Sequence, residues 1–117
     1  MTLIQYPSCS TCQKATAFLD SRGCRYETRH IRLEPPTAAE LADWHRKSGL
    51  PLKRFFNTSG QLYRSLGLKD SLPSMNEEQQ YQILATDGML VRRPLLIDGD
   101  RILVGFRETE WEKAVLV

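Results

Sequence analysis

The sequence contains no long hydrophobic run and few metal-binding side chains. No stretch of its 117 residues approaches the roughly 18 apolar residues that a membrane-spanning helix needs, and the N-terminus lacks the charged and apolar regions of an export signal. We therefore expect no membrane association and a cytoplasmic location. The spacing of Cys24, His30 and His45 matches no structural zinc site, so no metal site is expected.

Charge runs, repeats and low-complexity tracts are also missing. The 16 basic residues are interspersed with 14 acidic ones, and the net charge is only +2. A block of basic side chains is the usual mark of nucleic-acid binding, so we expect no direct contact with DNA or RNA. The length fits a single domain, residues 1–117, with one hydrophobic core, and we expect a monomer.

The chain does contain two cysteines separated by two residues, Cys9 and Cys12. They follow a β-prone segment at residues 2–6, and Ser10 with Gln13 forms an S-x-x-Q capping box that predicts a helix start between them. Backbone N–H groups at a helix N-terminus favour a thiolate and can lower the pKa of a cysteine from about 8.5 to roughly 3.5–7.5. In a cytoplasmic protein the pair favours redox chemistry over a structural bridge. Half a zinc site and a buried packing pair remain as alternatives.

The cysteine pair opens a strand, helix, strand unit. Phe18 and Leu19 lie on one face of a helix that is predicted over residues 11–22 and ends at Gly23. Residues 25–33 alternate imperfectly between apolar and polar side chains and are predicted to form a strand. Two strands joined by one helix usually form a right-handed parallel crossover.

Residues 34–88 are predicted to form a helical insert. Thr37 with Glu40 makes a capping box for one helix, and Ser74 with Glu77 makes a box for another. Aromatic residues between these boxes recur at the spacing of a buried helix face, so we interpret them as packing residues.

After the insert the pattern returns to β structure. Apolar runs at residues 95–97 and 101–104 flank an Asp98-Gly99 turn, and Asp-Gly between apolar runs predicts a β-hairpin. A closing amphipathic helix is expected at about residues 107–115.

The resulting order is βα, β, helical insert, ββα, with the cysteines at the first strand-to-helix turn. This order predicts an α/β thioredoxin-like fold with a central mixed sheet, whose thioredoxin half comprises residues 1–33 and 89–117. In that architecture a cis-proline opens the hairpin and lies against the active cysteines, which assigns this place to Pro94. Arg93 must be extended because it precedes a proline. The role of Arg92 is ambiguous from sequence, because an arginine beside Arg93 is usually solvated surface.

Several motifs together resemble the arsenate reductase and Spx family of thioredoxin-fold proteins, most closely its branch of small bacterial arsenate-reductase-related proteins. The resemblance covers essentially the whole chain. It rests on the Cys9–Cys12 pair, the helical insert, Asn57-Thr58-Ser59-Gly60, Arg93-Pro94-Leu95-Leu96-Ile97 and Val104-Gly105-Phe106.

The resemblance to the glutaredoxin-dependent arsenate reductases implies a set of roles. Cys9 would attack an oxyanion bound at the helix N-terminus by Ser10 and Thr11, and Arg93 would stabilise thiolate and anion. No bound cofactor is implied; glutathione is a candidate co-substrate, and glutaredoxin or a thioredoxin-type protein is the expected reductant. Two further arginines of the family are replaced by Ser59 and Gly105. This weighs against classical arsenate reduction, because each charge-assisted contact is worth roughly 1.5–3 kcal/mol.

The resemblance to the Spx branch implies a different role. There Cys9 and Cys12 would form a redox switch in a regulator that binds the C-terminal domain of the RNA polymerase α subunit. The stretch that contacts polymerase in that branch corresponds to Gly49–Arg54, which shows no clear match. The leading prediction is an oxidoreductase in which Cys9 attacks and Cys12 resolves, and the polymerase-binding regulator is the alternative.

Overall fold

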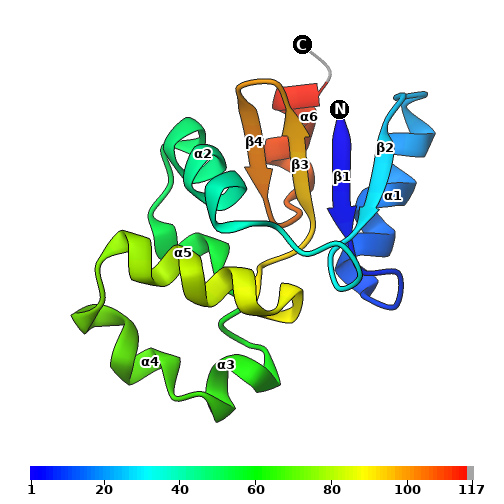
Figure 1. Cartoon of the computed structure of the whole chain (residues 1–117). Coiled ribbons are helices and arrows are strands. Elements are labelled where there is room, and N and C mark those ends of the chain that lie inside the picture. The colour runs from blue at the N-terminus through cyan, green and yellow to red at the C-terminus, as the bar shows by residue number, and fades with distance from the viewer. Residues whose placement is uncertain (116–117) are drawn as a thin grey trace.

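Figure 1 shows the computed structural model, which describes residues 1–115. Within this range the two ends of the chain supply β1 (Thr2–Gln5), α1 (Ser10–Ser21), β2 (Glu27–His30), β3 (Leu95–Asp98), β4 (Arg101–Val104) and α6 (Glu108–Val115). The segment between them contains α2 (Ala38–Ser48), α3 (Gln61–Ser65), α4 (Leu68–Ser71) and α5 (Glu77–Thr86), with the 3-10 turns η1 (Leu52–Phe55), η2 (Leu72–Ser74) and η3 (Gly88–Leu90). The predicted order of strands and helices is confirmed.

The strands form one mixed sheet in the order β2-β1-β3-β4. β1 and β2 run parallel because α1 carries the chain back along the sheet, whereas β3 runs antiparallel to both β1 and β4. Ile4 of β1 is paired with Leu95 of β3, and this strand pair joins the N-terminal and C-terminal parts of the chain. The sheet therefore has the α/β, thioredoxin-like arrangement that the sequence predicts.

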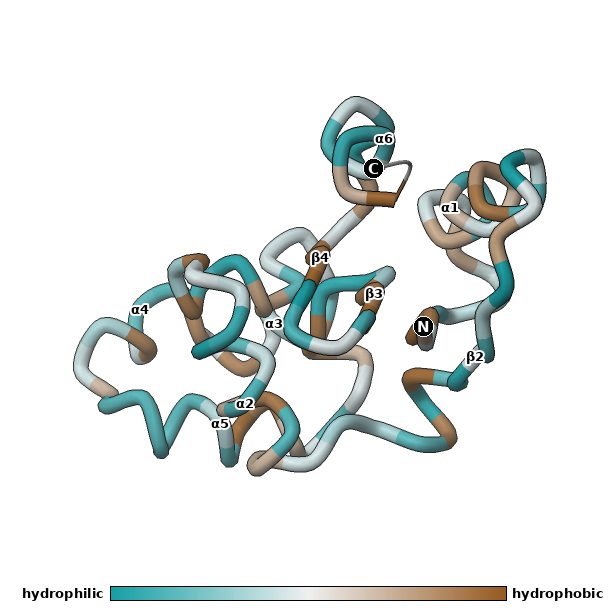
Figure 2. The backbone as a smooth tube through the Cα atoms, turned by 90° about the horizontal axis from the view of Figure 1, so that it is seen from above, coloured by the Kyte–Doolittle hydropathy of each residue, from teal (hydrophilic) through white to brown (hydrophobic). Residues whose placement is uncertain are grey.

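Each face of the sheet is covered by its own hydrophobic cluster. Leu3 and Ile4 are neighbours in β1, point to opposite faces and are both fully buried. On the Leu3 side, α1 and α6 pack through side chains that include Phe18 and Trp111. On the Ile4 side, the cluster runs without interruption into the helices of the insert. Figures 1 and 2 show these helices on the face opposite α1 and α6.

Two boundaries near the start of the insert follow from local hydrogen bonds. α2 begins with the predicted capping box of Thr37 and Glu40. β2 is shorter than the predicted strand, because the His30 ring nitrogen Nδ1 accepts the N–H groups of Arg32 and Leu33, both at 3.2 Å, and turns the chain. No helix within residues 1–115 is long and apolar enough to span a membrane.

The predicted start of α5 is wrong. The capping box expected at Ser74 does not form, because Leu72–Ser74 is a 3-10 turn and the Ser74 hydroxyl donates to the Ser71 carbonyl oxygen at 2.8 Å. Asn76 caps α5 instead, and its partner in a reciprocal capping box is Gln79. Both patterns are present in the sequence, and the proline turn that precedes α5 decides between them.

Candidate functional site

Cys9 ends the loop between β1 and α1 and is itself the N-cap residue of the helix. The expected cap at Ser10 is therefore wrong. The Cys9 N–H donates to the Tyr6 carbonyl oxygen at 3.0 Å, and the Cys9 carbonyl oxygen accepts the Gln13 N–H at 3.0 Å, which starts the helix at Ser10. The Gln13 side chain donates to the Pro7 carbonyl oxygen at 3.0 Å instead of returning to the cap. A thiol thus occupies the position where a hydroxyl or carboxylate usually accepts helix N–H groups.

The surroundings of Cys9 lower the pKa of its half-buried thiol. Burial acts in the opposite direction, but it is outweighed by the backbone N–H and thiol of Cys12, then by the N–H of Thr11, and last by the charge of Arg93. The neutral thiol makes no capping hydrogen bond. These donors therefore act by stabilising the negative charge once the proton leaves.

Cys12 lies in the first turn of α1 and has the opposite character. Its side chain is fully buried. Burial raises the pKa of Cys12 to about 12, and a hydrogen bond and the charge of Cys9 add to this effect. The Tyr6 N–H donates to the Cys12 sulfur at 3.5 Å and opposes the shift. All three cysteines are free thiols, and Cys24 packs against the α1–α6 cluster.

The peptide bond between Arg93 and Pro94 is cis, as the thioredoxin-like order implies. Pro94 is buried, and its carbonyl oxygen accepts the Gly105 N–H at 2.8 Å. The Arg93 guanidinium carbon lies 5.4 Å from the centroid of the Tyr6 ring. Its Nε and Nη1 atoms are buried and have no hydrogen-bond partner within residues 1–115. An unpaired buried donor costs about 1–3 kcal/mol, so this guanidinium is well placed to bind an anion.

A cavity of about 470 Å³ brings several predicted site residues together. Cys9, Thr11 and Arg93 line it, while Cys12 lies buried behind Cys9. Ser10 is exposed and is not among the lining residues. The remaining lining residues come from the insert and the hairpin: Asn57, Ser59, Gly60, Arg92, Gly105 and Phe106.

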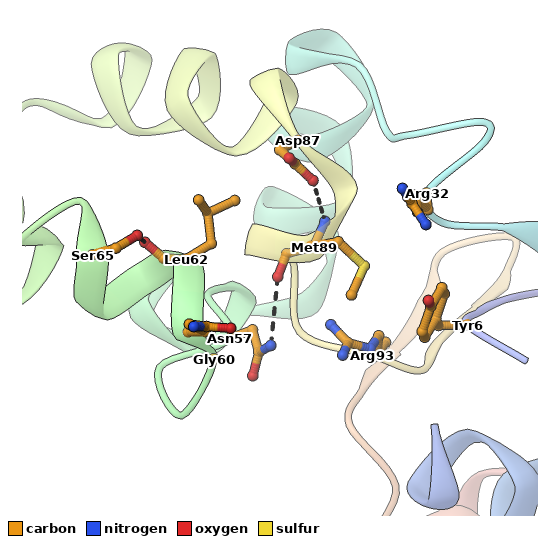
Figure 3. Close-up of a pocket in the computed structure, with 10 residues that line it drawn as sticks. Tyr6, Arg32, Asn57, Gly60, Leu62, Ser65, Asp87, Met89 and Arg93 are labelled. Atoms are coloured by element: carbon orange, nitrogen blue, oxygen red, sulfur yellow. Dashed lines mark hydrogen bonds between the residues drawn. The ribbon is translucent and has the colours of Figure 1, made fainter. Parts of the chain in front are cut away.

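A second cavity of about 470 Å³ adjoins the first, and the two share Asn57, Gly60 and Arg93. Figure 3 shows the Arg93 side chain beside the Tyr6 ring in this cavity. The Asn57 side-chain amide donates to the Met89 carbonyl oxygen at 3.4 Å. The insert therefore supplies one wall of both cavities, and Asn57 belongs to the Asn57-Thr58-Ser59-Gly60 motif of the family resemblance, which by itself assigns it no role.

Arg92 is the other residue that the sequence-based interpretation missed. It is half-buried and lines the cavity with Cys9, so the structure resolves the ambiguity of the sequence against a purely solvated arginine. A Cβ atom added to Gly105 would lie 2.8 Å from Arg92 Nε, which shows that the Arg92 side chain passes over the bare glycine. Within residues 1–115, no group of three or more histidine, cysteine or acidic side chains could hold a metal ion.

Comparison with known proteins agrees with this geometry. The ArsC family model matches residues 4–114. The uncharacterized protein YusI of Bacillus subtilis is 47% identical over 113 residues, covering 97% of this chain and 96% of its own. The global transcriptional regulator Spx of Listeria innocua is 32% identical over 111 residues, covering 94% of this chain and 82% of its own.

A solved structure shows the same fold at high sequence similarity. It is a protein from Bacteroides fragilis described as ArsC family related, and it superimposes with a TM-score of 0.93 at 50% identity, covering 96% of this chain and 94% of its own. Family model, relatives and solved structure all span nearly the whole chain. The chain therefore belongs to the ArsC family.

Proposed function

We propose that this protein is a thiol-disulfide oxidoreductase in which Cys9 is the nucleophile and Cys12 is the resolving thiol. The observation that carries the proposal is the opposite direction of the two pKa shifts: the pKa of Cys9 is lowered, whereas burial raises that of Cys12 to about 12. The reachable sulfur therefore ionises first, and the buried one keeps its proton. Such a division of roles is what a two-step dithiol reaction requires.

In the first step the Cys9 thiolate attacks one sulfur of a substrate disulfide. A Cys9–substrate disulfide forms, the substrate S–S bond breaks, and the leaving sulfur departs as a thiolate. Arg93 supports this step, because its guanidinium contributes to the lowered pKa of Cys9 and its buried Nε and Nη1 face no protein acceptor within residues 1–115.

In the second step Cys12 gives its proton to the thiolate released in the first step and attacks the Cys9 sulfur. An internal Cys9–Cys12 disulfide forms and the second substrate thiolate is released, so the protein loses two electrons and the substrate gains two. The charge of the Cys9 thiolate raises the pKa of Cys12, and this effect ends when Cys9 becomes part of the mixed disulfide. The first step therefore prepares the second.

A reductant must restore the dithiol after each cycle. We propose a glutaredoxin or thioredoxin-type protein in this role, with glutathione as a co-substrate and no bound cofactor, acting on a monomer in the cytoplasm. Pro94 would lie in the loop that meets this partner and the substrate, because Arg93, the residue before it, lines the same cavity as Cys9. Thr11 contributes its N–H group at the helix N-terminus.

Oxyanion reduction starts with the same attack by Cys9, but it requires a site that binds a multiply charged anion. An arsenate dianion needs several charge-assisted contacts, each worth roughly 1.5–3 kcal/mol. Ser59 and Gly105 line the cavity and supply no charge, so Arg92 and Arg93 are the cationic residues among those that line it. We therefore propose that disulfides are better substrates than arsenate.

A second candidate function follows from the similarity to Spx, a global transcriptional regulator that is 32% identical. In this alternative the Cys9–Cys12 pair would switch binding to the RNA polymerase α subunit, without turnover. A pull-down with the C-terminal domain of that subunit, using oxidised and reduced protein, separates the two functions. Binding without any disulfide reductase activity would favour the regulator.

The oxidoreductase is tested by mild oxidation followed by mass spectrometry of the disulfides. We expect a Cys9–Cys12 disulfide in the wild-type protein and a trapped mixed disulfide on Cys9 in the Cys12→Ser variant. Cys24→Ser is the matched control, because Cys24 is a free thiol on the α1–α6 cluster and should leave the pattern unchanged. A pair that stays reduced at the potential of cytoplasmic oxidants contradicts the mechanism.

A further inference from the structure

Arg92 does not belong to the machinery derived above, yet its side chain enters the cavity that contains Cys9. It reaches this place by passing over Gly105, where an added Cβ would lie 2.8 Å from Arg92 Nε and 3.6 Å from its Cδ. Gly105 has a φ of +73°, a conformation that favours glycine. The hairpin end is therefore shaped to admit an arginine side chain from the neighbouring loop.

Arg92 also lines a separate cavity of about 290 Å³ on its other side. The walls of this cavity come from η1 and the residues on either side of it, and include Lys53, Arg54 and Thr58. Arg92 is thus the shared wall between a cavity that contains the thiol and a cavity lined by cations. The backbone keeps it there, since the Arg92 N–H donates to the Phe55 carbonyl oxygen at 2.8 Å.

The charges around Arg92 are not neutralised by acidic side chains. Within residues 1–115, ion pairs join other basic residues to acids, but none involves Lys53, Arg54 or Arg92. Burial lowers the pKa of Arg92, and the nearby charges of Arg54 and Arg107 lower it further. Like charges held this close without a counter-charge favour the binding of an anion.

The size and position of the two cavities narrow the chemistry of that anion. A small oxyanion at Cys9 would fill only the cavity that contains the thiol. A ligand that uses both cavities must place a sulfur against Cys9 and an anionic group beyond Arg92. Carboxylates pair with arginine through two parallel N–H···O bonds, and an arginine side chain with a free guanidinium provides this geometry.

We propose that Arg92 and Arg54, together with Lys53 and Thr58, form a second anion-binding site that holds the carboxylate of a disulfide substrate while Cys9 attacks its sulfur. This inference rests on the thiol-disulfide function proposed above and names the substrate class of the same site, a low-molecular-weight disulfide that carries carboxylates. The exchange step is unchanged: the Cys9 sulfur forms the new S–S bond and the leaving sulfur takes the electron pair.

The test compares the rates at which Cys9 reacts with a dianionic disulfide, 5,5′-dithiobis(2-nitrobenzoate), and with neutral 2,2′-dithiodipyridine, both followed by absorbance. Dividing each variant's rate by the wild-type rate with the same reagent removes differences in leaving group. We expect Arg92→Gln to lower the rate with the dianion roughly tenfold more than the rate with the neutral reagent, the effect of losing one charge-assisted contact. Arg54→Gln should act in the same direction, and added salt should reduce the difference.

Arg25→Gln is the matched control, because Arg25 is exposed beyond the far end of α1. An equal loss with both reagents in Arg92→Gln would mean that Arg92 only supports the fold, and would overturn the second site. If Arg25→Gln lowered the rate with the dianionic reagent as much as Arg92→Gln does, the second site would be overturned as well. If wild-type Cys9 reacts with neither reagent faster than a free cysteine does, the proposed function itself fails. A neutral reagent that reacts fast while the dianion shows no dependence on Arg92 removes only the further inference.

Discussion

Replacing Gly88 with alanine should destabilise the fold by about 2 kcal/mol or more. Gly88 is buried at the start of η3, and an added Cβ would lie 1.9 Å from the Ile31 carbonyl oxygen and 2.7 Å from its carbonyl carbon. Both atoms belong to the backbone, so no side-chain rotation can relieve the contact. Overpacking a core costs typically about 1–3 kcal/mol, and a backbone clash belongs to the upper part of that range. The opposing gain from a less flexible unfolded chain is only about 0.4–1 kcal/mol.

Urea or thermal unfolding followed by circular dichroism measures this effect. In a chain of this length, 2 kcal/mol corresponds to a Tm lower by roughly 8 °C. Gly99→Ala is the matched control, because Gly99 has nothing within 4 Å of an added Cβ and a φ of +60°. The free energy of unfolding of Gly99→Ala should fall only by the cost of placing an alanine in the left-handed conformation, roughly 1 kcal/mol. If Gly88→Ala were destabilised no more than Gly99→Ala, the close packing of η3 against the segment after β2 would be refuted.

Three further predictions concern the core, the charges and the thiols. Trp111→Phe removes a buried indole N–H that donates to a backbone carbonyl oxygen at 3.0 Å, and should lower the free energy of unfolding in urea by about 1–3 kcal/mol. Hydrogen bonds from Arg29 hold the pKa of Glu40 below its usual value, so the stability they provide is present above about pH 4.3 and is lost as the pH falls through the folded value. The stability difference between Arg29→Met and wild type, followed by urea unfolding, should therefore shrink on acidification. Mass spectrometry after brief iodoacetamide treatment should show Cys9 labelled below the usual thiol pKa of about 8.5, with Cys12 unlabelled; equal labelling of both would contradict the assigned roles.

The sequence predicted the fold well because most of its signals are local. The hairpin around Asp98-Gly99, the Thr37 capping box and the helical spacing of Phe18 and Leu19 each involve residues that are close in the chain, and each is borne out, with Gly99 and Asp100 forming the turn of the hairpin. The order of these elements is then compatible with few sheet topologies, because parallel strands need a crossover helix between them. The cis bond before Pro94 was predicted from that topology and not from its neighbours.

The errors occurred where two local patterns compete. Ser10 and Cys9 could each precede the first helical residue, and the hydrogen bond from the Cys9 N–H to Tyr6 decides for Cys9. Ser74 and Asn76 each stand three residues before a Glu or Gln, and the 3-10 turn decides for Asn76. In both cases a hydrogen bond outside the capping box determines which residue caps the helix. The sequence of the box itself does not reveal that hydrogen bond.

The place of Arg92 could not be predicted from sequence for a different reason. Its position depends on Gly105, which is 13 residues later in the chain. Gly105 has no side chain, and folding of the hairpin brings this empty space next to Arg92. The two residues were interpreted separately, one as solvated surface and the other as the loss of a family arginine. The structure places them together, so the missing side chain at one position makes room for the charge at the other.

The causes of the lowered Cys9 pKa explain why the proposed chemistry would persist when arginines are lost. Among the groups that lower the pKa of Cys9, the N–H and thiol of Cys12 and the N–H of Thr11 act more strongly than the charge of Arg93. The lowered pKa is therefore mainly a property of the α1 N-terminus, whereas in the proposed function the selection of the substrate would depend on the arginines of the surrounding loops. Under that function, changes at Ser59 and Gly105 would alter which anion the cavity binds without removing the proposed nucleophile. A family member that loses the contacts for arsenate would for this reason retain disulfide exchange, because that reaction needs the thiolate and a second thiol but no dianion site.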